Sequence, residues 1–245
     1  MNFYKEKLHI NRKELKMKKI LNNKRIGYAI IAILGAILSI QLIKMNVHDR
    51  DDGFFHILRI IGTKYAISDG NVIPLIAPYF CRDFGYAINI FYQPLVTYIP
   101  LLISLFTNTN ATALKIFAGL TIILSGIFMY KFIYNVTKSK IASFLAGLVY
   151  MAAPYHLTNI YARYAMGEFA GMVFIPLVFL GLQNLFDGDG KKHYYISIGA
   201  IGLLLSHTIT SFYTAIIGVI YILYHVRAFK KKDVWRKCIL NLIFT

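Results

Sequence analysis

The sequence is poor in charged residues and in cysteine. Charged side chains make up 16% of the 245 residues, against about a quarter in soluble domains. The two cysteines, Cys81 and Cys238, do not have the spacing of a zinc site. Glycine-rich phosphate loops, the His-Glu-x-x-His zinc motif and the Gly-x-Ser-x-Gly nucleophile motif are absent. These absences exclude a disulfide-stapled scaffold and provide no motif of the common soluble enzymes.

Apolar residues, by contrast, make up 57% of the chain, and the mean hydropathy is +0.55. A water-soluble core cannot hold that much apolar surface. The sequence therefore predicts an all-α fold, a polytopic transmembrane helix bundle. The expected spans are about 26–43, 111–130, 141–157, 169–186, 194–209, 210–226 and a truncated run at 238–245. Because eight residues cannot cross a bilayer, we expect the chain to be the N-terminal part of a longer protein.

The net charge of +16 is explained by membrane topology rather than by nucleic-acid binding. Residues 1–25 carry nine Lys and Arg and form a basic cytoplasmic tail, either amphipathic on the membrane surface or simply solvated. In the long polar segment 44–110, the apolar stretch 94–106 is too short to span and contains Pro100, which predicts an interfacial or re-entrant helix. If 88–106 does not cross, 20 of the 27 Lys and Arg lie on the N-terminal side. The positive-inside rule then places this protein in the cell membrane with a cytoplasmic N-terminus.

Segment 44–110 becomes a long first outer loop, and it contains the first candidate site. Asp52, His56 and Arg59 would share one face of a helix. A carboxylate beside an imidazole can bind a divalent cation or act as a base with its orienting partner, and a guanidinium can bind a phosphate. Asp49 and Asp51 lie next to them in the sequence. The alternative is that Asp52 only caps an amphipathic surface helix.

Two further candidates lie near the predicted outer ends of later spans. Arg163 and Glu168 are ionisable groups at the mouth of two spans, which indicates either a functional site or a structural ion pair. His207 lies in the uncharged stretch 194–226, as a cavity-lining residue or as a hydrogen-bonded structural histidine. The topology brings both candidates to the same face of the membrane as Asp52.

These residues also lie in recognisable motifs, within the segments Asp52–Ile60, Gly70–Pro74, Gly85–Leu95, Pro154–Leu157, Arg163–Glu168 and Leu205–His207. The sequence resembles a bacterial multi-spanning family named 6-pyruvoyl-tetrahydropterin synthase-related membrane proteins, which is similar to the GT-C glycosyltransferases and not to the soluble pterin enzyme. The resemblance covers roughly residues 26–245. The family shows His-Asp where this chain has Asp51-Asp52, and His48-Asp49 offers the same pair, so Asp49 and Asp52 compete for the key position. Asp52 has the better spacing to His56 and Arg59.

The resemblance implies a GT-C-like fold and transfer of a sugar from a polyprenyl-phosphate carrier on the outer face. Asp52, His56 and Glu168 would be catalytic, and Arg59 and Arg163 would bind the carrier phosphate. Asp49, Asp51 and His207 would line the site, and Asp52 with Glu168 could hold a divalent metal ion, Mg²⁺ or Mn²⁺.

The expected partners are membrane lipids and the carrier-linked sugar donor, and no nucleic acid. Two other functions stay open. The chain could be a transporter or flippase for a lipid-linked or anionic solute, because the same buried charges can line a path. It could also be a non-catalytic fragment. The oligomeric state is left open by the sequence.

Overall fold

The computed structural model describes residues 24–77, 80–82, 84–186, 191–230 and 232–244. The described residues form helices and loops, and their one β-type pairing is an isolated bridge between Ala77 and Tyr86. The predicted basic tail lies outside the described residues except for Lys24 and Arg25. Helical segments long and apolar enough to cross a membrane are Arg25–Lys44, Asn110–Thr137, Lys140–Arg163 and Met166–Phe186. The chain is therefore an all-helical protein with membrane-spanning character.

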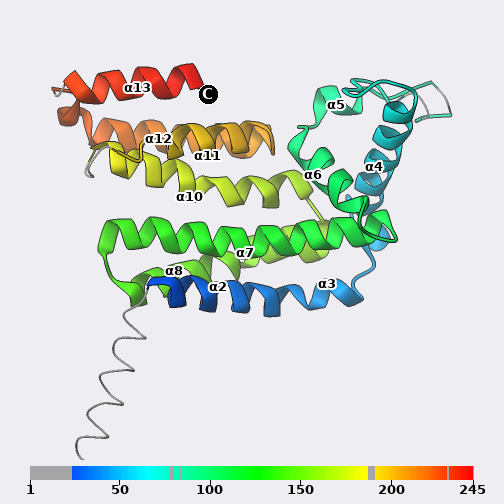
Figure 1. Ribbon diagram of the computed structural model, residues 1–245, viewed down its shortest axis with the longest axis horizontal. Helices are drawn as coiled ribbons and strands as arrows, with labels where there is room; N and C mark the ends of the chain where they lie inside the picture. The colour runs from blue at the N-terminus through cyan, green and yellow to red at the C-terminus, as the bar shows by residue number, and fades with distance from the viewer. Residues whose placement is uncertain (1–23, 78–79, 83, 187–190, 231, 245) are drawn as a thin grey trace, which may run out of the picture.

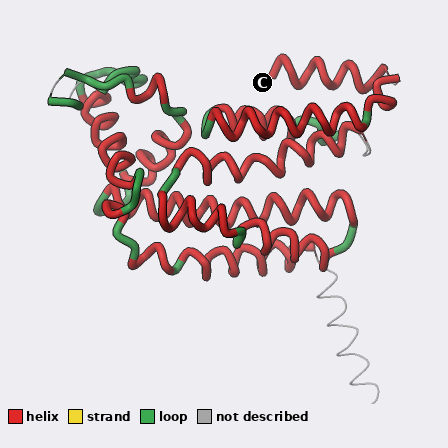
Figure 2. Tube along the Cα trace, turned by 180° about the vertical axis from the view of Figure 1, so that it is seen from behind, coloured by secondary structure: helices red, strands yellow, loops and turns green. Residues whose placement is uncertain are grey.

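Most helices lie side by side in one bundle (Figures 1 and 2). Helix α7 packs against α2, α8 and α10, and α10 packs against α11 and α12. The bundle elements are α2 (Lys24–Ser39), α3 (Gln41–Lys44), α7 (Asn110–Thr137), α8 (Lys140–Met151), α9 (Pro154–Thr158), the π-helix η2 (Asn159–Arg163), α10 (Met166–Phe186), α11 (Tyr195–Leu204), α12 (Thr208–Tyr224), η3 (Val226–Lys230) and α13 (Lys232–Phe244).

The remaining elements lie across one end of this bundle (Figure 1). They are η1 (Val47–Asp49), α4 (Gly53–Ser68), α5 (Ile88–Phe91) and α6 (Leu95–Ser104). Helix α6 has ten residues, with Pro94 at its N-cap and Pro100 inside it. The first turns of α7, α10 and α12 lie at the same end, which we call the site end. The α7–α8, α10–α11 and α12–α13 connections lie at the opposite end, which we call the basic end because it carries Lys138, Lys140, Lys191, Lys192 and Arg227.

Several helix boundaries differ from the apolar runs in the sequence. Helix α7 continues seven residues past 130, because Lys131 interrupts the hydropathy but not the helix, which ends where Lys138 adopts a left-handed conformation (φ 56°). The run 141–157 is divided at Ala152–Ala153, because a helix rarely continues through the residue before a proline. Helix α11 ends at Leu204 and α12 begins at Thr208, so the turn lies between them and not at 209–210. The last helix begins at Lys232, six residues before the predicted apolar run.

The core has two parts. The larger one surrounds α7 and buries Phe117, Ile122 and Phe169, and the smaller one lies between α10, α11 and α13. Glycines allow close contact where α7 meets α8, since a Cβ on Gly147 would lie 2.9 Å from the carbonyl oxygen of Gly126. Small residues are the usual means of packing apolar helices closely in a membrane. This packing fixes the helix ends that build the cavity described next.

Candidate functional site

A cavity of about 180 Å³ at the site end gathers side chains from four separate segments. They come from α4, from the α5–α6 turn, from the η2–α10 turn and from the α11–α12 turn. Six of the residues singled out in the sequence line it, namely Asp52, His56, Arg59, Arg163, Glu168 and His207. The other lining residues are Phe55, Tyr92, Gln93, Val96, Ala165, Met166, Gly167 and Ser206.

Asp49 and Asp51 do not line this cavity. Both are exposed, and the carboxylate of Asp49 accepts a hydrogen bond from Asn46 Nδ2 at 2.7 Å within the η1 turn. Of the two acids that compete for the key position, the structure therefore places Asp52 in the cavity and Asp49 outside it.

Asp52 immediately precedes α4 and joins it to η2, because its backbone N–H donates to the carbonyl oxygen of Arg163 at 2.9 Å. The carboxylate makes no capping hydrogen bond to α4, although the residue occupies the N-cap position. Burial raises the pKa of Asp52, with Arg163 opposing the rise and Asp51 and Glu168 adding to it. A half-buried carboxylate with a raised pKa and no capping role is available to accept a proton.

Arg59 is buried, with 1% of its surface exposed. Its guanidinium donates to Thr97 Oγ1 at 2.5 Å and to the Gln93 carbonyl oxygen at 3.4 Å, and it lies 4.8 Å from the centre of the Tyr92 ring. Its Nε has no hydrogen-bond partner, and in the described part of the chain no carboxylate lies within 4.0 Å of it. Burial lowers the pKa of Arg59 to about 10, so the group stays charged at neutral pH. A buried cation with neutral neighbours needs an anion to complete its environment.

His56 contacts Arg59 and not the carboxylate of Asp52. Arg59 Nη1 lies 3.3 Å from His56 Nδ1, and an arginine can only donate, so Nδ1 is the acceptor. Burial, reinforced by Arg59, lowers the pKa of His56 to about 3. The imidazole is therefore neutral, and its contact with Asp52 is through the backbone, from His56 N to Asp52 O at 3.1 Å.

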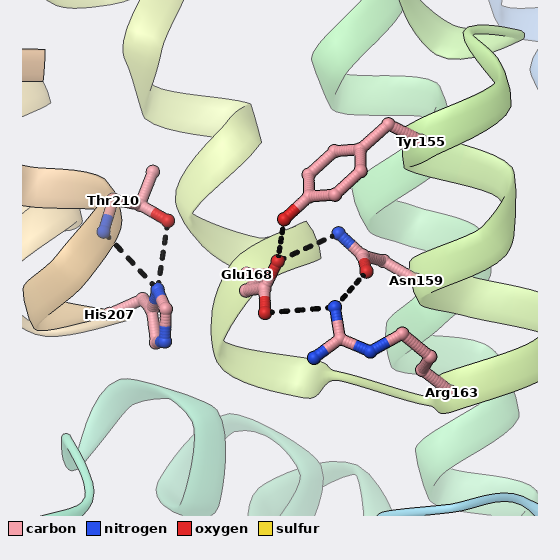
Figure 3. A network of polar contacts seen from close by, with 6 residues as sticks. All are labelled: Tyr155, Asn159, Arg163, Glu168, His207 and Thr210. Atoms are coloured by element: carbon pink, nitrogen blue, oxygen red, sulfur yellow. Dashed lines mark hydrogen bonds and ion pairs between the residues drawn. The ribbon is translucent and has the colours of Figure 1, made fainter. Parts of the chain in front are cut away.

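Glu168 lies in the first turn of α10 and is held by a network of donors (Figure 3). Oε1 pairs with Arg163 Nη1 at 3.1 Å, while Oε2 accepts from Asn159 Nδ2 at 3.0 Å and from the hydroxyl of Tyr155. Arg163 Nη1 also donates to Asn159 Oδ1 at 2.7 Å. The positive end of the α10 dipole further favours the carboxylate. Glu168 therefore fixes the position of Arg163 at the cavity wall.

Sequence reasoning missed Tyr155 and Asn159. The signal was present, because Tyr155, Asn159 and Arg163 are spaced four residues apart and such residues share a helical face. The π-helix that contains the last two ends at Arg163, and the next residue, Tyr164, adopts a left-handed conformation (φ 57°). Single π-turns are frequent at functional sites because they re-aim side chains.

His207 combines a structural role with a place in the cavity wall. It is the N-cap of α12, and its Nδ1 accepts from the backbone N–H of Thr210 at 3.3 Å and pairs with Thr210 Oγ1 at 2.8 Å (Figure 3). Since Nδ1 accepts from a backbone N–H, the proton of the neutral ring is on Nε2. The ring is therefore held in one orientation beside Gly167.

Gly167 allows α10 to contact the α11–α12 turn closely, and a larger residue at this position should disturb the cavity. A Cβ there would lie 2.9 Å from His207 Cδ2 and 3.0 Å from the Ser206 carbonyl oxygen. We expect Gly167→Ala to lower the free energy of unfolding by about 1–3 kcal/mol, as overpacking does. The control is Gly218→Ala in α12, where the nearest atom would be 4.0 Å away and the helix should gain about 1 kcal/mol. Thermal unfolding of both variants in detergent measures this, and equal stabilities would contradict the close contact.

The predicted metal site would use the carboxylates of Asp52 and Glu168. Within the described residues there is no group of three or more His, Cys, Asp or Glu that could hold a metal ion. Both oxygens of Glu168 are already engaged by donors, so a metal ion would have to displace Arg163 or Tyr155. A metal ion held by Asp52 and Glu168 stays a prediction.

The fold and the cavity define a class, a helical membrane protein with a charged cavity at one end of its bundle. Comparison with known proteins adds no family and no function to this description. No family model matches the chain, and no solved structure matches it. An uncharacterized protein of Lactococcus lactis subsp. cremoris (strain MG1363) is 29% identical over 202 residues, which cover 80% of this chain and 33% of that protein. The chain thus spans about a third of the length of this relative.

Proposed function

We propose that this chain is part of a GT-C-like glycosyltransferase that takes a sugar from a polyprenyl-phosphate carrier at the site end of the bundle. One observation carries the proposal. Arg59, a buried guanidinium without a carboxylate partner among the described residues, lines the same cavity as Asp52, a carboxylate whose pKa is raised. A cation that lacks an anion and a base that lacks a proton are what the transfer of a phosphate-linked sugar to a hydroxyl requires.

In the proposed reaction, a hydroxyl oxygen of the acceptor attacks the anomeric carbon of the sugar. The bond between that carbon and the carrier phosphate oxygen breaks, and the phosphate leaves with the electron pair. The proton of the hydroxyl passes to the carboxylate of Asp52. Arg59 offsets the negative charge that grows on the leaving phosphate, and neutral His56 holds the guanidinium through Nδ1. The products are the glycosylated acceptor and the free carrier phosphate.

Arg163 is the second cation of the proposed phosphate site. Its guanidinium is oriented by Glu168 and Asn159, so Glu168 acts as a positioning residue in this scheme. Because Glu168 already compensates its charge, Arg163 should contribute less to anion binding than Arg59. His207 and Gln93 complete the cavity wall.

The charge distribution supports an orientation with the site end outside the cell. Lysines and arginines gather at the basic end, which the positive-inside rule assigns to the cytoplasm. The N-terminus of α2 is at that end. Carrier-linked sugars would then reach the cavity from the outer half of the membrane.

The proposal is tested by measuring consumption of a polyprenyl-phosphate-linked sugar by the purified protein in detergent. We expect release of carrier phosphate, detected by mass spectrometry, on addition of a hydroxyl acceptor. A transporter or flippase would leave the donor intact in detergent and move it only in sealed vesicles. The longer Lactococcus relative is assayed in parallel. Activity in the relative alone would show that segments beyond this chain are required, and intact donor with both proteins would refute the proposal.

A further inference from the structure

A second cavity, of about 320 Å³, lies between α2–α3 and the first turns of α7. None of its residues lines the candidate site. We call it the α2–α7 groove. Its lining residues are Ser39, Leu42, Ile43, Thr112, Lys115, Ile116 and Gly119.

The groove exists because the first span is interrupted opposite a glycine. Helix α2 ends at Ser39, whose hydroxyl donates to the Gly35 carbonyl oxygen at 2.7 Å, a bond that often bends helices. On α7, Gly119 has no side chain to fill the space. A Cβ there would lie 3.3 Å from Ser39 Oγ and 3.7 Å from Leu42 Cδ1. Both walls therefore leave this space open, α2 because it ends at Ser39 and α7 because Gly119 has no side chain.

The two ends of the groove differ in chemistry. Lys115 and Thr112 form the polar end, where Lys115 Nζ donates to the Ile43 carbonyl oxygen at 3.1 Å. Among the described residues, no carboxylate lies within 4.0 Å of this ammonium group. The walls beyond it are mainly apolar, because the hydroxyl of Ser39 is bonded to Gly35 within α2, and Ile43 and Ile116 remain 74% and 42% exposed. A cation above an exposed apolar slot is complementary to an anionic head group with a hydrocarbon chain.

The depth of the groove in the membrane agrees with this chemistry. Both walls belong to segments long and apolar enough to span, Arg25–Lys44 and Asn110–Thr137. Helix α7 has 28 residues and is about 42 Å long, so it exceeds a hydrocarbon core of about 30 Å by roughly 6 Å at each end. Lys115 is five residues into α7, or about 8 Å along its axis. Its flexible stem can therefore bring the ammonium group to the level of lipid phosphates.

We infer that the α2–α7 groove binds one anionic phospholipid. Lys115 and Thr112 contact its phosphate, and one acyl chain lies along Leu42, Ile43 and Ile116. The lipid seals the gap left by the interruption of the first span. This site is separate from the cavity at which the carrier is proposed to bind, so it does not depend on the proposed function.

The experiment compares lipids retained by the purified chain, using phosphatidylglycerol and phosphatidylcholine with the same acyl chains. Native mass spectrometry of the detergent-solubilised protein counts the lipid bound. We expect wild-type protein to retain phosphatidylglycerol in preference, and Lys115→Gln to lower this retention about fivefold, the effect of one lysine beside an anionic lipid. The matched control is Lys64→Gln, which removes the same charge at the same end of the bundle. Lys64 donates to Asn110 Oδ1 at 2.8 Å and does not line the groove.

Three results would overturn the inference. Unchanged retention in Lys115→Gln would show that the groove does not select an anionic head group. An equal loss in Lys64→Gln would show a general surface-charge effect. Displacement of phosphatidylglycerol by an equal amount of polyprenyl phosphate would assign the groove to the carrier. Size-exclusion chromatography of each variant verifies that the protein is folded, and half-exposed Lys115 can be replaced without opening the core.

Discussion

Replacing Asp52 with asparagine is expected to lower the rate of sugar transfer by about 10²–10⁴-fold, the usual contribution of a general base. The amide keeps the size of the side chain, and the backbone bond from Asp52 N to the Arg163 carbonyl oxygen is unaffected. Binding of the carrier phosphate should therefore be retained or slightly tightened, because one negative charge leaves the cavity. Initial rates of donor consumption and the dissociation constant for the carrier alone separate these two effects.

The pH dependence of the wild-type rate provides an independent signature of the same carboxylate. The base must be deprotonated to act, so the rate should fall as the pH drops through the raised pKa of Asp52. His56, with a pKa of about 3, should add no transition between pH 5 and 8. Asp69→Asn, at the far end of α4, is the control and should keep the wild-type rate and profile. Full activity in Asp52→Asn would rule out the proposed base.

Replacing Arg59 with methionine should weaken binding of the carrier phosphate about 100-fold, or roughly 3 kcal/mol, as expected when a buried charge partner is removed. The same change should have little effect on stability, because two effects oppose each other. The pKa of Arg59, about 10 against 12.5, corresponds to roughly 3 kcal/mol of unfavourable free energy for the charged form, which the substitution relieves. Against this, Thr97 and His56 lose a hydrogen-bond partner, which costs about 1–3 kcal/mol.

The dissociation constant for polyprenyl phosphate and the unfolding temperature in detergent test the two halves of this expectation. Arg82→Met removes an exposed arginine from the same polar segment and should change neither quantity. Arg59→Lys should restore only part of the affinity, since an ammonium group cannot reach Thr97, Gln93 and the phosphate together. Two results would show that Arg59 has only a structural role. One is normal carrier binding by Arg59→Met. The other is that Arg59→Met fails to fold while Arg59→Lys is stable and binds the carrier with unchanged affinity.

The helical membrane character of the chain could be predicted from sequence because it depends on apolar run length and on charge. The segments 111–130 and 169–186 lie within α7 and α10, and 26–43 coincides with α2 and α3, which are separated at Ile40. The helix boundaries were less predictable, because single side chains and turns determine them. Lys131 ends an apolar run while α7 continues, and Pro154 ends α8 inside a run. His207 caps the N-terminus of α12, because its ring accepts a hydrogen bond from the Thr210 N–H, a property that hydropathy does not measure.

The sequence by itself determined which residues could take part in acid–base chemistry or anion binding, because ionisable residues are rare among apolar runs and can be recognised without a structure. It also favoured Asp52 over Asp49 through the spacing to His56 and Arg59. The tertiary structure decided which of these groups meet. It placed Asp49 and Asp51 outside the cavity, turned His56 toward Arg59, and added Tyr155 and Asn159 around Glu168. These outcomes depend on contacts between helix ends far apart in the chain, such as Gly167 against His207, and the packing of the bundle fixes those contacts.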